Sequence, residues 1–272
     1  MLPLNFHKTF IPERRLIAAI LDFAEKDGEG NFQDISADTG IPMGKSTGKV
    51  PAILDYANGM GLISIEKKKE GIRKPILTPF GAIVNNEDRF LSEEITQWIA
   101  HMNLCRGDIG ARSWHEIFAK GRNILGSSFT KQQLESYLVN TFGKGKDRMG
   151  PMLIMYADNA SFSKASVLSV HNNDVVRKKA PMTDVFALAY SAYILSLLET
   201  YFPGDNQITV TEFNVKTLWF DICLWNQTDI ENVLRIVQGK GFVSVDRQMQ
   251  PWIIEKMATS SDVWPIIYNE LA

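Results

Sequence analysis

The residues of this chain best suited to chemistry are basic side chains gathered in one stretch. The candidate contact residues are Lys45, Ser46, Lys49, Lys67, Lys68, Lys69, Arg73 and Lys74. Lysine and arginine bind phosphate oxygens, so such a stretch suits a polyanion. The formal net charge of −2 over 272 residues excludes a uniformly basic surface. Contact with double-stranded DNA is therefore predicted to come from a local patch.

Local signals predict the elements that would position these cations. A short helix over Asp34–Thr39 ends before Pro42, because a residue that precedes proline avoids the helical region. A longer helix over Lys45–Asn58 carries apolar residues at the spacing of one helical face. Two β-compatible runs, Leu62–Glu66 and Lys74–Thr78, flank a cationic tip and predict a hairpin. This order is that of a winged helix-turn-helix, in which the second helix enters the major groove and the wing lies against phosphates.

Other interpretations of the same stretch stay open. Winged helices also serve as protein–protein modules, and lysines on a hairpin tip can simply protect a sheet edge from strand pairing. The run Gly40–Ser46 looks like a phosphate-binding loop, but it has three residues between its glycines instead of four and follows a helix instead of a strand. We therefore exclude a nucleotide site there. A second basic patch is expected between Arg177 and Lys179.

The cysteine and histidine residues point to no established site. His101 and Cys105 lie four apart on a predicted helix over Ser92–Arg106 and could both bind a metal, but no further ligands are evident. Packing in the core is the favoured interpretation. With Cys223 as the only other cysteine there is no disulfide framework, and neither a signal peptide nor a membrane span is found. A cytoplasmic protein is predicted, with no membrane association.

The predicted fold is mainly α and has three domains. They are a winged helix-turn-helix DNA-binding domain over residues 1–84, a helical domain over 85–204 and a winged-helix-like unit over 205–272. The apolar helix Asp184–Tyr201 is expected to centre the helical domain, in which Thr130 and Gln133 predict a capping box and Val167–Val170 a strand. The last unit repeats the order of helix, glycine break and hairpin. Its hairpin tip is nearly neutral, which favours protein interaction or dimerisation.

Six short blocks carry a resemblance to a known bacterial family. They are Phe6–Phe10 (FHKTF), Leu62-Ile63, Thr78–Gly81 (TPFG), Trp98–His101 (WIAH), Ala111–Phe118 (ARSWHEIF) and Phe129–Leu134. In their order they resemble the SspB-type nicking subunits of the Ssp single-strand DNA phosphorothioation system, whose genes neighbour those of phosphoadenosine-phosphosulfate-reductase-like enzymes. The resemblance is clearest over the first half of the chain and thin beyond Asp147.

The resemblance implies an activity and a set of partners. The activity is a Mg²⁺-dependent nick in one DNA strand, which prepares the backbone for replacement of a non-bridging phosphate oxygen by sulfur. The implied partners are a cysteine desulfurase, an ATP-pyrophosphatase-like sulfur carrier and an ATPase, within a DNA modification and antiviral defence system. A homodimer is a further expectation.

Such a cleavage requires carboxylates that converge on the metal, which activates water and offsets charge on the leaving oxygen. No established nuclease spacing is present in the sequence. By elimination, the candidates are carboxylates beside polar loops and cations: Asp147, Glu116 and Asp174 as catalytic residues, with Asp147 and Asp174 also as metal ligands. Lys146 or Arg148 would steady the phosphate. The alternative for Glu116 and Asp174 is a surface ion pair of small energetic weight.

Three functional hypotheses stay open. The first is a Mg²⁺-dependent DNA-nicking protein. The second is a non-enzymatic DNA-binding scaffold that recruits sulfur-transfer enzymes, motivated by the missing nuclease spacing. The third is a transcriptional regulator, which ranks lower because the predicted helical domain shows no signature of a ligand pocket.

Overall fold

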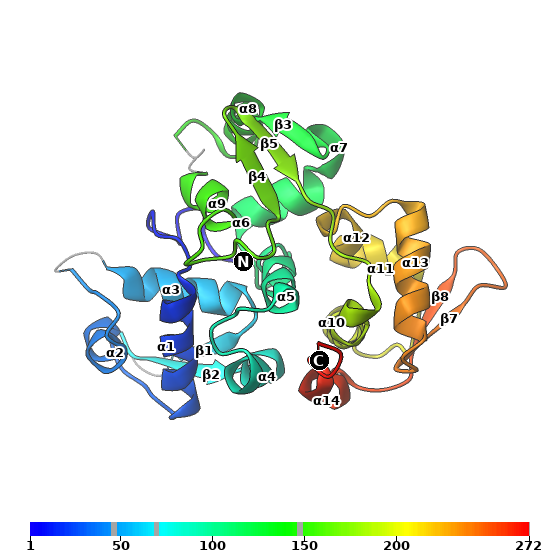
Figure 1. Cartoon of the computed structure of the whole chain (residues 1–272), viewed down its shortest axis with the longest axis horizontal. Coiled ribbons are helices and arrows are strands. Elements are labelled where there is room, and N and C mark those ends of the chain that lie inside the picture. Colours follow the sequence, from blue (N-terminus) through cyan, green and yellow to red (C-terminus); the bar gives the residue numbers. More distant parts are fainter. Residues whose placement is uncertain (45–47, 68–70, 146–148, 272) are drawn as a thin grey trace. The chain divides into compact units, whose positions relative to one another are not determined.

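The structure is a computed structural model that describes residues 1–44, 48–67, 71–145 and 149–271 (Figure 1). The chain divides into two compact units, Met1–Lys178 and Lys179–Ala272. Helices dominate both units, and the described residues also form three small antiparallel sheets. The mainly α class predicted from the sequence is confirmed. Within the described ranges, no helix is long and apolar enough to cross a membrane.

The boundary between the units differs from the predicted domain ranges 1–84, 85–204 and 205–272. Helix α10 (Ala187–Tyr201) was expected to centre a middle domain. It packs instead against α13 (Gln227–Gln238) and α14 (Ser260–Val263), and so belongs to the second unit. The expectation placed α10 wrongly because its all-round apolar surface shows that it is buried, but not which elements bury it.

The first unit begins with three helices, a hairpin and two further helices. They are α1 (Arg14–Glu25), α2 (Phe32–Thr39), α3 (Lys49–Gly59), β1 (Ile63–Lys67), β2 (Arg73–Leu77), α4 (Pro79–Glu87) and α5 (Glu94–Leu104). The Asn31 side chain caps α2 by accepting hydrogen bonds from the backbone of Gln33 and Asp34, and Gly40, at φ 70°, ends that helix. Helix α3 begins at Lys49 and not at Lys45, because Gly48 is extended and the Lys49 amide donates to the Pro42 carbonyl over 3.0 Å.

The remainder of the first unit contains more strands than the one that was expected. It comprises α6 (Arg112–Trp114), the π-helix η1 (His115–Lys120), α7 (Arg122–Leu125), β3 (Ser128–Thr130), α8 (Lys131–Phe142), α9 (Gly150–Met155), β4 (Leu168–His171) and β5 (Asp174–Arg177). The predicted capping box of Thr130 and Gln133 and the strand near Val170 are confirmed. Strands β3 and β5 were missed because runs of three or four residues are too short to show a periodicity. Asn172, at φ 55°, supplies the left-handed turn residue between β4 and β5.

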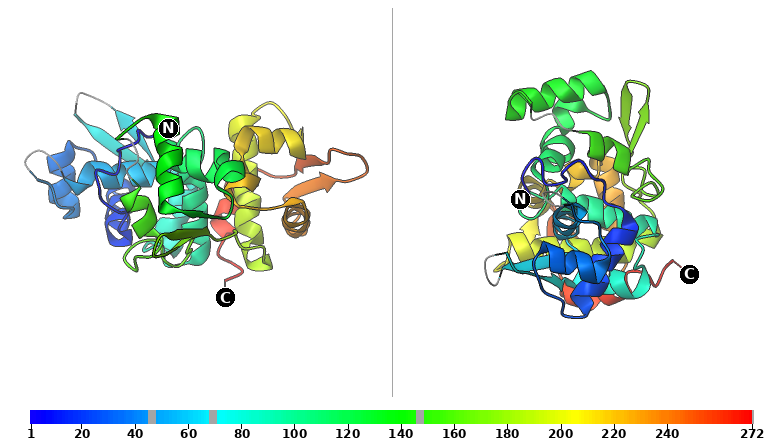
Figure 2. Two further views of the ribbon diagram at one scale, coloured as in Figure 1. Left: turned by 90° about the horizontal axis from the view of Figure 1, so that it is seen from above. Right: turned by 90° about the vertical axis from the view of Figure 1, so that its left-hand side faces the viewer.

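The second unit contains the other helices and the third sheet. Besides α10, α13 and α14 it has the 3₁₀ turns η2 (Asp184–Phe186) and η3 (Trp264–Ile266), with β6 (Gln207–Thr209), α11 (Val210–Thr217), α12 (Trp219–Ile222), β7 (Val243–Asp246) and β8 (Ile253–Lys256). The predicted hairpin is present as β7 and β8, which project from the unit (Figure 2). Leu218, at φ 52°, ends α11 and separates it from α12.

One arrangement recurs three times along the described chain. A short strand or a single bridging residue leads directly to a capped helix, and one strand of a later hairpin pairs with that strand or residue. The pairs are Gly30 with Arg73 of β2, β3 with β5, and β6 with β8. The caps are Asn31, Thr130 and Thr209, and each side chain accepts a hydrogen bond from the amide three residues on. We call residues 30–77, 128–177 and 207–256 the first, second and third modules.

Three of the six blocks behind the sequence resemblance meet in one aromatic core of the first unit. The ring of Phe6 packs edge to face on Tyr56 and Trp114, with centroids 4.7 and 5.6 Å apart. The Tyr156 hydroxyl accepts a hydrogen bond from the Trp114 indole over 3.0 Å and lies 2.7 Å from His101 Nδ1. All five side chains are buried. Phe6, His101 and Trp114 of these blocks therefore pack between Tyr56 of the first module and Tyr156 of the second, which is a structural role.

Candidate nucleic-acid interface

Most of the predicted DNA-contact residues lie where the structure gives no side chain. Lys45, Ser46, Lys68 and Lys69 are outside the described residues, and only the backbone of Lys67, at the end of β1, is described. Their contacts with DNA stay predictions from the sequence. The side chains of Lys49, Arg73 and Lys74 are described, and all three belong to the first module.

These three cations are engaged by neighbouring side chains. Lys49 forms an ion pair with Glu13, and Lys74 Nζ lies 2.6 Å from Asp27 Oδ1. The guanidinium of Arg73 lies over the ring of Phe32, 5.6 Å from its centroid. Surface ion pairs exchange easily, so phosphate can compete for these lysines. Arg73 also lines a pocket of the first module.

The outward face of α3 carries polar groups and no cation. Pro51, Asp55 and Asn58 recur at the spacing of one helical face and are partly exposed, whereas the opposite face is buried. Carboxylate and amide groups hydrogen-bond to the edges of bases, whereas a carboxylate repels phosphate. This face is therefore suited to contact bases, with phosphate contacts supplied by its surroundings.

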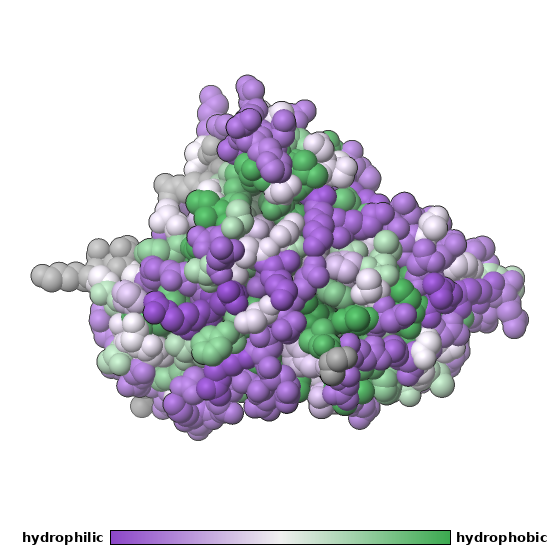
Figure 3. All heavy atoms as spheres, viewed as in Figure 1, coloured by the Kyte–Doolittle hydropathy of each residue, from purple (hydrophilic) through white to green (hydrophobic). Residues whose placement is uncertain are grey.

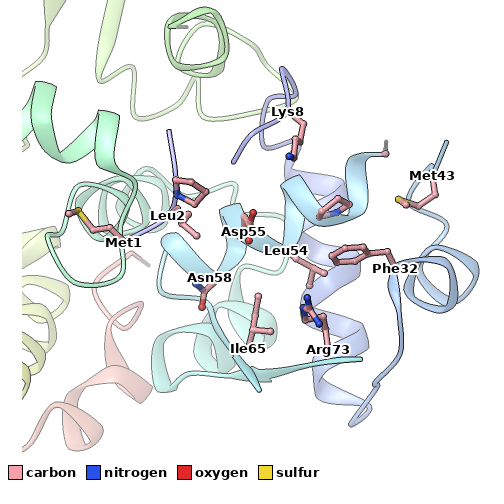
Figure 4. Close-up of a pocket in the computed structure, with 13 residues that line it drawn as sticks. Met1, Leu2, Lys8, Phe32, Met43, Leu54, Asp55, Asn58, Ile65 and Arg73 are labelled. Carbon is pink, nitrogen blue, oxygen red and sulfur yellow. The ribbon is translucent and has the colours of Figure 1, made fainter. Parts of the chain in front are cut away.

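A pocket of about 630 Å³ covers that face (Figure 4). Its walls come from the N-terminal segment, the start of α2, α3 and the hairpin: Met1, Leu2, Pro3, Lys8, Phe32, Met43, Gly48, Pro51, Leu54, Asp55, Asn58, Ile65 and Arg73. The N-terminal segment is tied in place, because the Leu2 amide donates to the Gly110 carbonyl over 2.8 Å and Leu2 packs over Gly59 of α3. The face of α3 thus forms the floor of a pocket.

Sequence reasoning missed the side chains that give this pocket its character: Lys8, Phe32, Asp55 and Asn58. Asp55 and Asn58 had a signal, since they are the polar residues opposite the apolar face of their helix. Lys8 and Phe32 had none. They reach the pocket only because the N-terminal segment and the start of α2 are brought beside α3 by tertiary contacts.

The pair His101 and Cys105 belongs to the core, as the favoured interpretation holds. Both are fully buried, and Cys105 Sγ lies 3.7 Å from His101 Nδ1. Burial, followed by the charge of Arg177, lowers the pKa of His101 from 6.5 to about 3, so the imidazole is neutral at physiological pH. Burial raises the pKa of the Cys105 thiol well above its ordinary value. The described residues provide no third ligand for a metal.

The predicted catalytic carboxylates are not brought together in the described part of the chain. Asp147 lies outside the described residues. Glu116, on η1, accepts a hydrogen bond from the Tyr137 hydroxyl over 3.0 Å and lies 3.6 Å from Lys120 Nζ. Burial and then this hydrogen bond raise the pKa of Tyr137 to about 12. Asp174 is exposed at the start of β5, and no group of three histidine, cysteine, aspartate or glutamate side chains among the described residues could hold a metal.

The prediction of a second basic patch at Arg177–Lys179 is wrong. Arg177 is buried, donates to the Phe118 carbonyl over 2.9 Å and stacks on the Phe118 ring at 5.1 Å. Lys178 Nζ lies 2.8 Å from a carboxylate oxygen of Glu94. The sequence of three consecutive cations at Arg177–Lys179 predicts a basic surface. The alternation of β5, however, turns Arg177 to the buried side of its sheet.

Together, these features define a mainly α protein built from recurring helix-and-hairpin modules, one of which bears a polar pocket. Its fold is that of SspB. A magnesium ion-bound SspB crystal structure matches with a TM-score of 0.66 and 14% sequence identity, over 98% of this chain and 87% of that one. A second SspB crystal structure matches with a TM-score of 0.63 and 15% identity over the same shares. No family model matches the sequence, and no curated protein matches it either. The resemblance drawn from short sequence blocks is confirmed at the level of the fold.

Proposed function

We propose that this protein is the DNA-binding, Mg²⁺-dependent nicking component of an Ssp-type DNA phosphorothioation and defence system in the cytoplasm. The observation that carries the proposal is the likeness to SspB over 98% of the chain. The sequence blocks support it independently. The partners in this proposal are double-stranded DNA and the sulfur-transfer enzymes, namely a cysteine desulfurase, an ATP-pyrophosphatase-like carrier and an ATPase.

In this proposal the first module acts as a winged helix. Its hairpin carries the run Lys67–Lys69, and Lys8 and Arg73 flank the polar face of α3, so cations surround groups that suit base edges. Mg²⁺, when bound, would activate water and offset charge on the leaving oxygen. One SspB crystal structure is described as magnesium ion-bound. Glu116 and Asp174 do not fit such a site together, because the described residues form no metal-binding group. We assign no step to them.

Supercoiled plasmid should become open circular when the protein and Mg²⁺ are both present, and EDTA should prevent the conversion. Agarose gels followed over time measure it. Asp147→Asn is expected to abolish nicking while DNA binding is kept, and Asp205→Asn, a matched change of an exposed carboxylate, should leave nicking unchanged. Equal rates for wild type and Asp147→Asn would reject Asp147 as a catalytic residue. Binding without any nick would support the scaffold hypothesis instead.

Reversing the hairpin charges should weaken binding to DNA of any sequence. A Lys67→Glu, Lys68→Glu, Lys69→Glu variant is expected to lose roughly tenfold or more in affinity and to show a salt slope smaller by ~2 to 3, since each phosphate contact contributes about 0.9 to that slope. Fluorescence anisotropy at several salt concentrations measures both. Lys164→Glu, a reversal at an exposed lysine outside the first module, serves as the control. An unchanged slope would remove the hairpin from the interface.

A further inference from the structure

We propose that the pocket on the first module takes a single unpaired nucleotide of a DNA strand. Its base would lie between Phe32 and Asn58, and its phosphate beside Lys8 and Arg73. The inference rests on the proposed DNA binding, and it changes how α3 is used. Instead of entering a major groove, the helix provides the floor of a binding site.

The shape of the pocket carries the first step of the argument. A major groove accepts a projecting helix, but the outward face of α3 is flanked by the N-terminal segment on one side and by Ile65 and Arg73 of the hairpin on another. The bases of a duplex are stacked and cannot enter a recess unless they leave the stack. A volume of about 630 Å³ matches a ligand of nucleotide size.

The side chains in the pocket carry the second step. Phe32 is partly exposed and, together with the Arg73 guanidinium 5.6 Å from its centroid, provides aromatic and planar cationic groups on which a base can stack. The amide of Asn58 places a donor beside an acceptor, which complements the Watson–Crick edge of a base. In the view of Figure 4, Asn58 and Ile65 lie to the left of Leu54, Phe32 lies to its right and Arg73 lies below it. Leu54 therefore lies between the ring of Phe32 and the amide of Asn58.

The groups that would hold the nucleotide are already fixed in place. The backbones of Arg73 and Gly30 exchange two hydrogen bonds, of 2.8 and 3.1 Å, and Asn31 caps the helix on which Phe32 is the first residue. Leu54 is buried in the floor. A preorganised site spends less free energy on ordering side chains when a ligand binds.

The second module shows that the polar lining does not follow from the topology alone. A pocket of about 430 Å³ occupies the corresponding place, beside the first residue of α8, the face of α9 and strand β4. Where the first module has Asp55 and Asn58 on α3, this pocket has Ile154 on α9 and Ala157 just after that helix. Apolar side chains reach the surface of the second module (Figure 3), and Ile154 is 52% exposed. The set of Phe32, Asp55 and Asn58 is thus not repeated in the corresponding pocket of the second module.

The experiment compares three labelled DNAs by fluorescence anisotropy: a duplex with one bulged nucleotide, the same duplex with an abasic bulge, and the fully paired duplex. The abasic bulge keeps the backbone and its charge but lacks the base. The wild-type protein should bind the bulged DNA about tenfold more tightly than the abasic DNA, in line with the usual loss when stacking on one base is removed. Phe32→Ala and Asn58→Ala should each reduce that difference while the affinity for paired duplex is kept.

Phe90→Ala and Asn86→Ala are the matched controls, since both residues are exposed and neither lines the pocket. Phe32→Leu keeps an apolar side chain without a ring, so it tests stacking even if Phe32→Ala folds poorly. Equal binding of bulged and abasic DNA by the wild-type protein would overturn the inference, while the proposed DNA binding would stand. Absence of binding to all three DNAs would overturn both.

Discussion

A Gly81→Ala substitution is expected to prevent the first unit from folding stably. A Cβ atom at Gly81 would lie 1.7 Å from the carbonyl oxygen of Leu62, which is a backbone atom and cannot move away by a change of rotamer. The same region is clamped by Thr78, whose Oγ1 donates to the Gly61 carbonyl over 2.6 Å and accepts from the Gly81 amide over 2.9 Å. The clash cannot be relieved without breaking this clamp.

The expected loss exceeds about 4 kcal/mol, a value reached by few single substitutions. For a protein of this size, that corresponds to a fall in Tm of roughly 10 °C or more. Circular dichroism melts or calorimetry measure it. Gly204→Ala is the matched control, because nothing lies within 4 Å of a Cβ at that position. A Gly81→Ala protein with the same Tm as the wild type would show that β1 and α4 are not packed as described.

Acidification should destabilise the first unit through His101. Its pKa is about 3 in the folded state, against 6.5 as the ordinary value. Between these values the unfolded chain binds the proton and the folded chain does not, so stability falls as the pH is lowered below about 6.5. The groups around the imidazole, Tyr156, Cys105 and Arg177, offer no carboxylate to hold the charged form. The expected loss is about 2 kcal/mol at pH 5 and roughly 4 kcal/mol near pH 3, relative to pH 8.

Urea unfolding at pH 8, 6 and 5 measures this dependence. A His101→Gln variant is expected to be less stable at every pH but to lose the part of the slope that His101 contributes. His171→Gln is the control, since it makes the same substitution at an exposed histidine. If the wild type and His101→Gln show the same slope between pH 8 and 5, His101 is not held neutral by burial.

Local sequence signals were enough to predict helices in both units and the hairpins β1–β2 and β7–β8. The Thr130 cap begins α8 and Gly40 ends α2 as predicted, whereas α2 begins at Phe32, two residues before the predicted Asp34. The spacing of apolar residues predicted the buried face of α3. Capping and helical periodicity act within a few residues, so they can be read without knowing the fold. Strands β3 and β5 could not be predicted in this way, because a strand of three or four residues is stabilised by its partner across the sheet.

The sequence by itself determined the mainly α class, the approximate position of several helices and, through six short blocks, the likeness to SspB in fold. Only the tertiary structure decided what those blocks do, because Phe6, His101 and Trp114 come together in a core from distant parts of the chain. It also decided that Arg177 is buried and that Lys8, Phe32 and Asn58 share a pocket. The physical reason is the range of the interactions. Charge and propensity belong to single residues, whereas burial and convergence depend on chain segments that pack side by side.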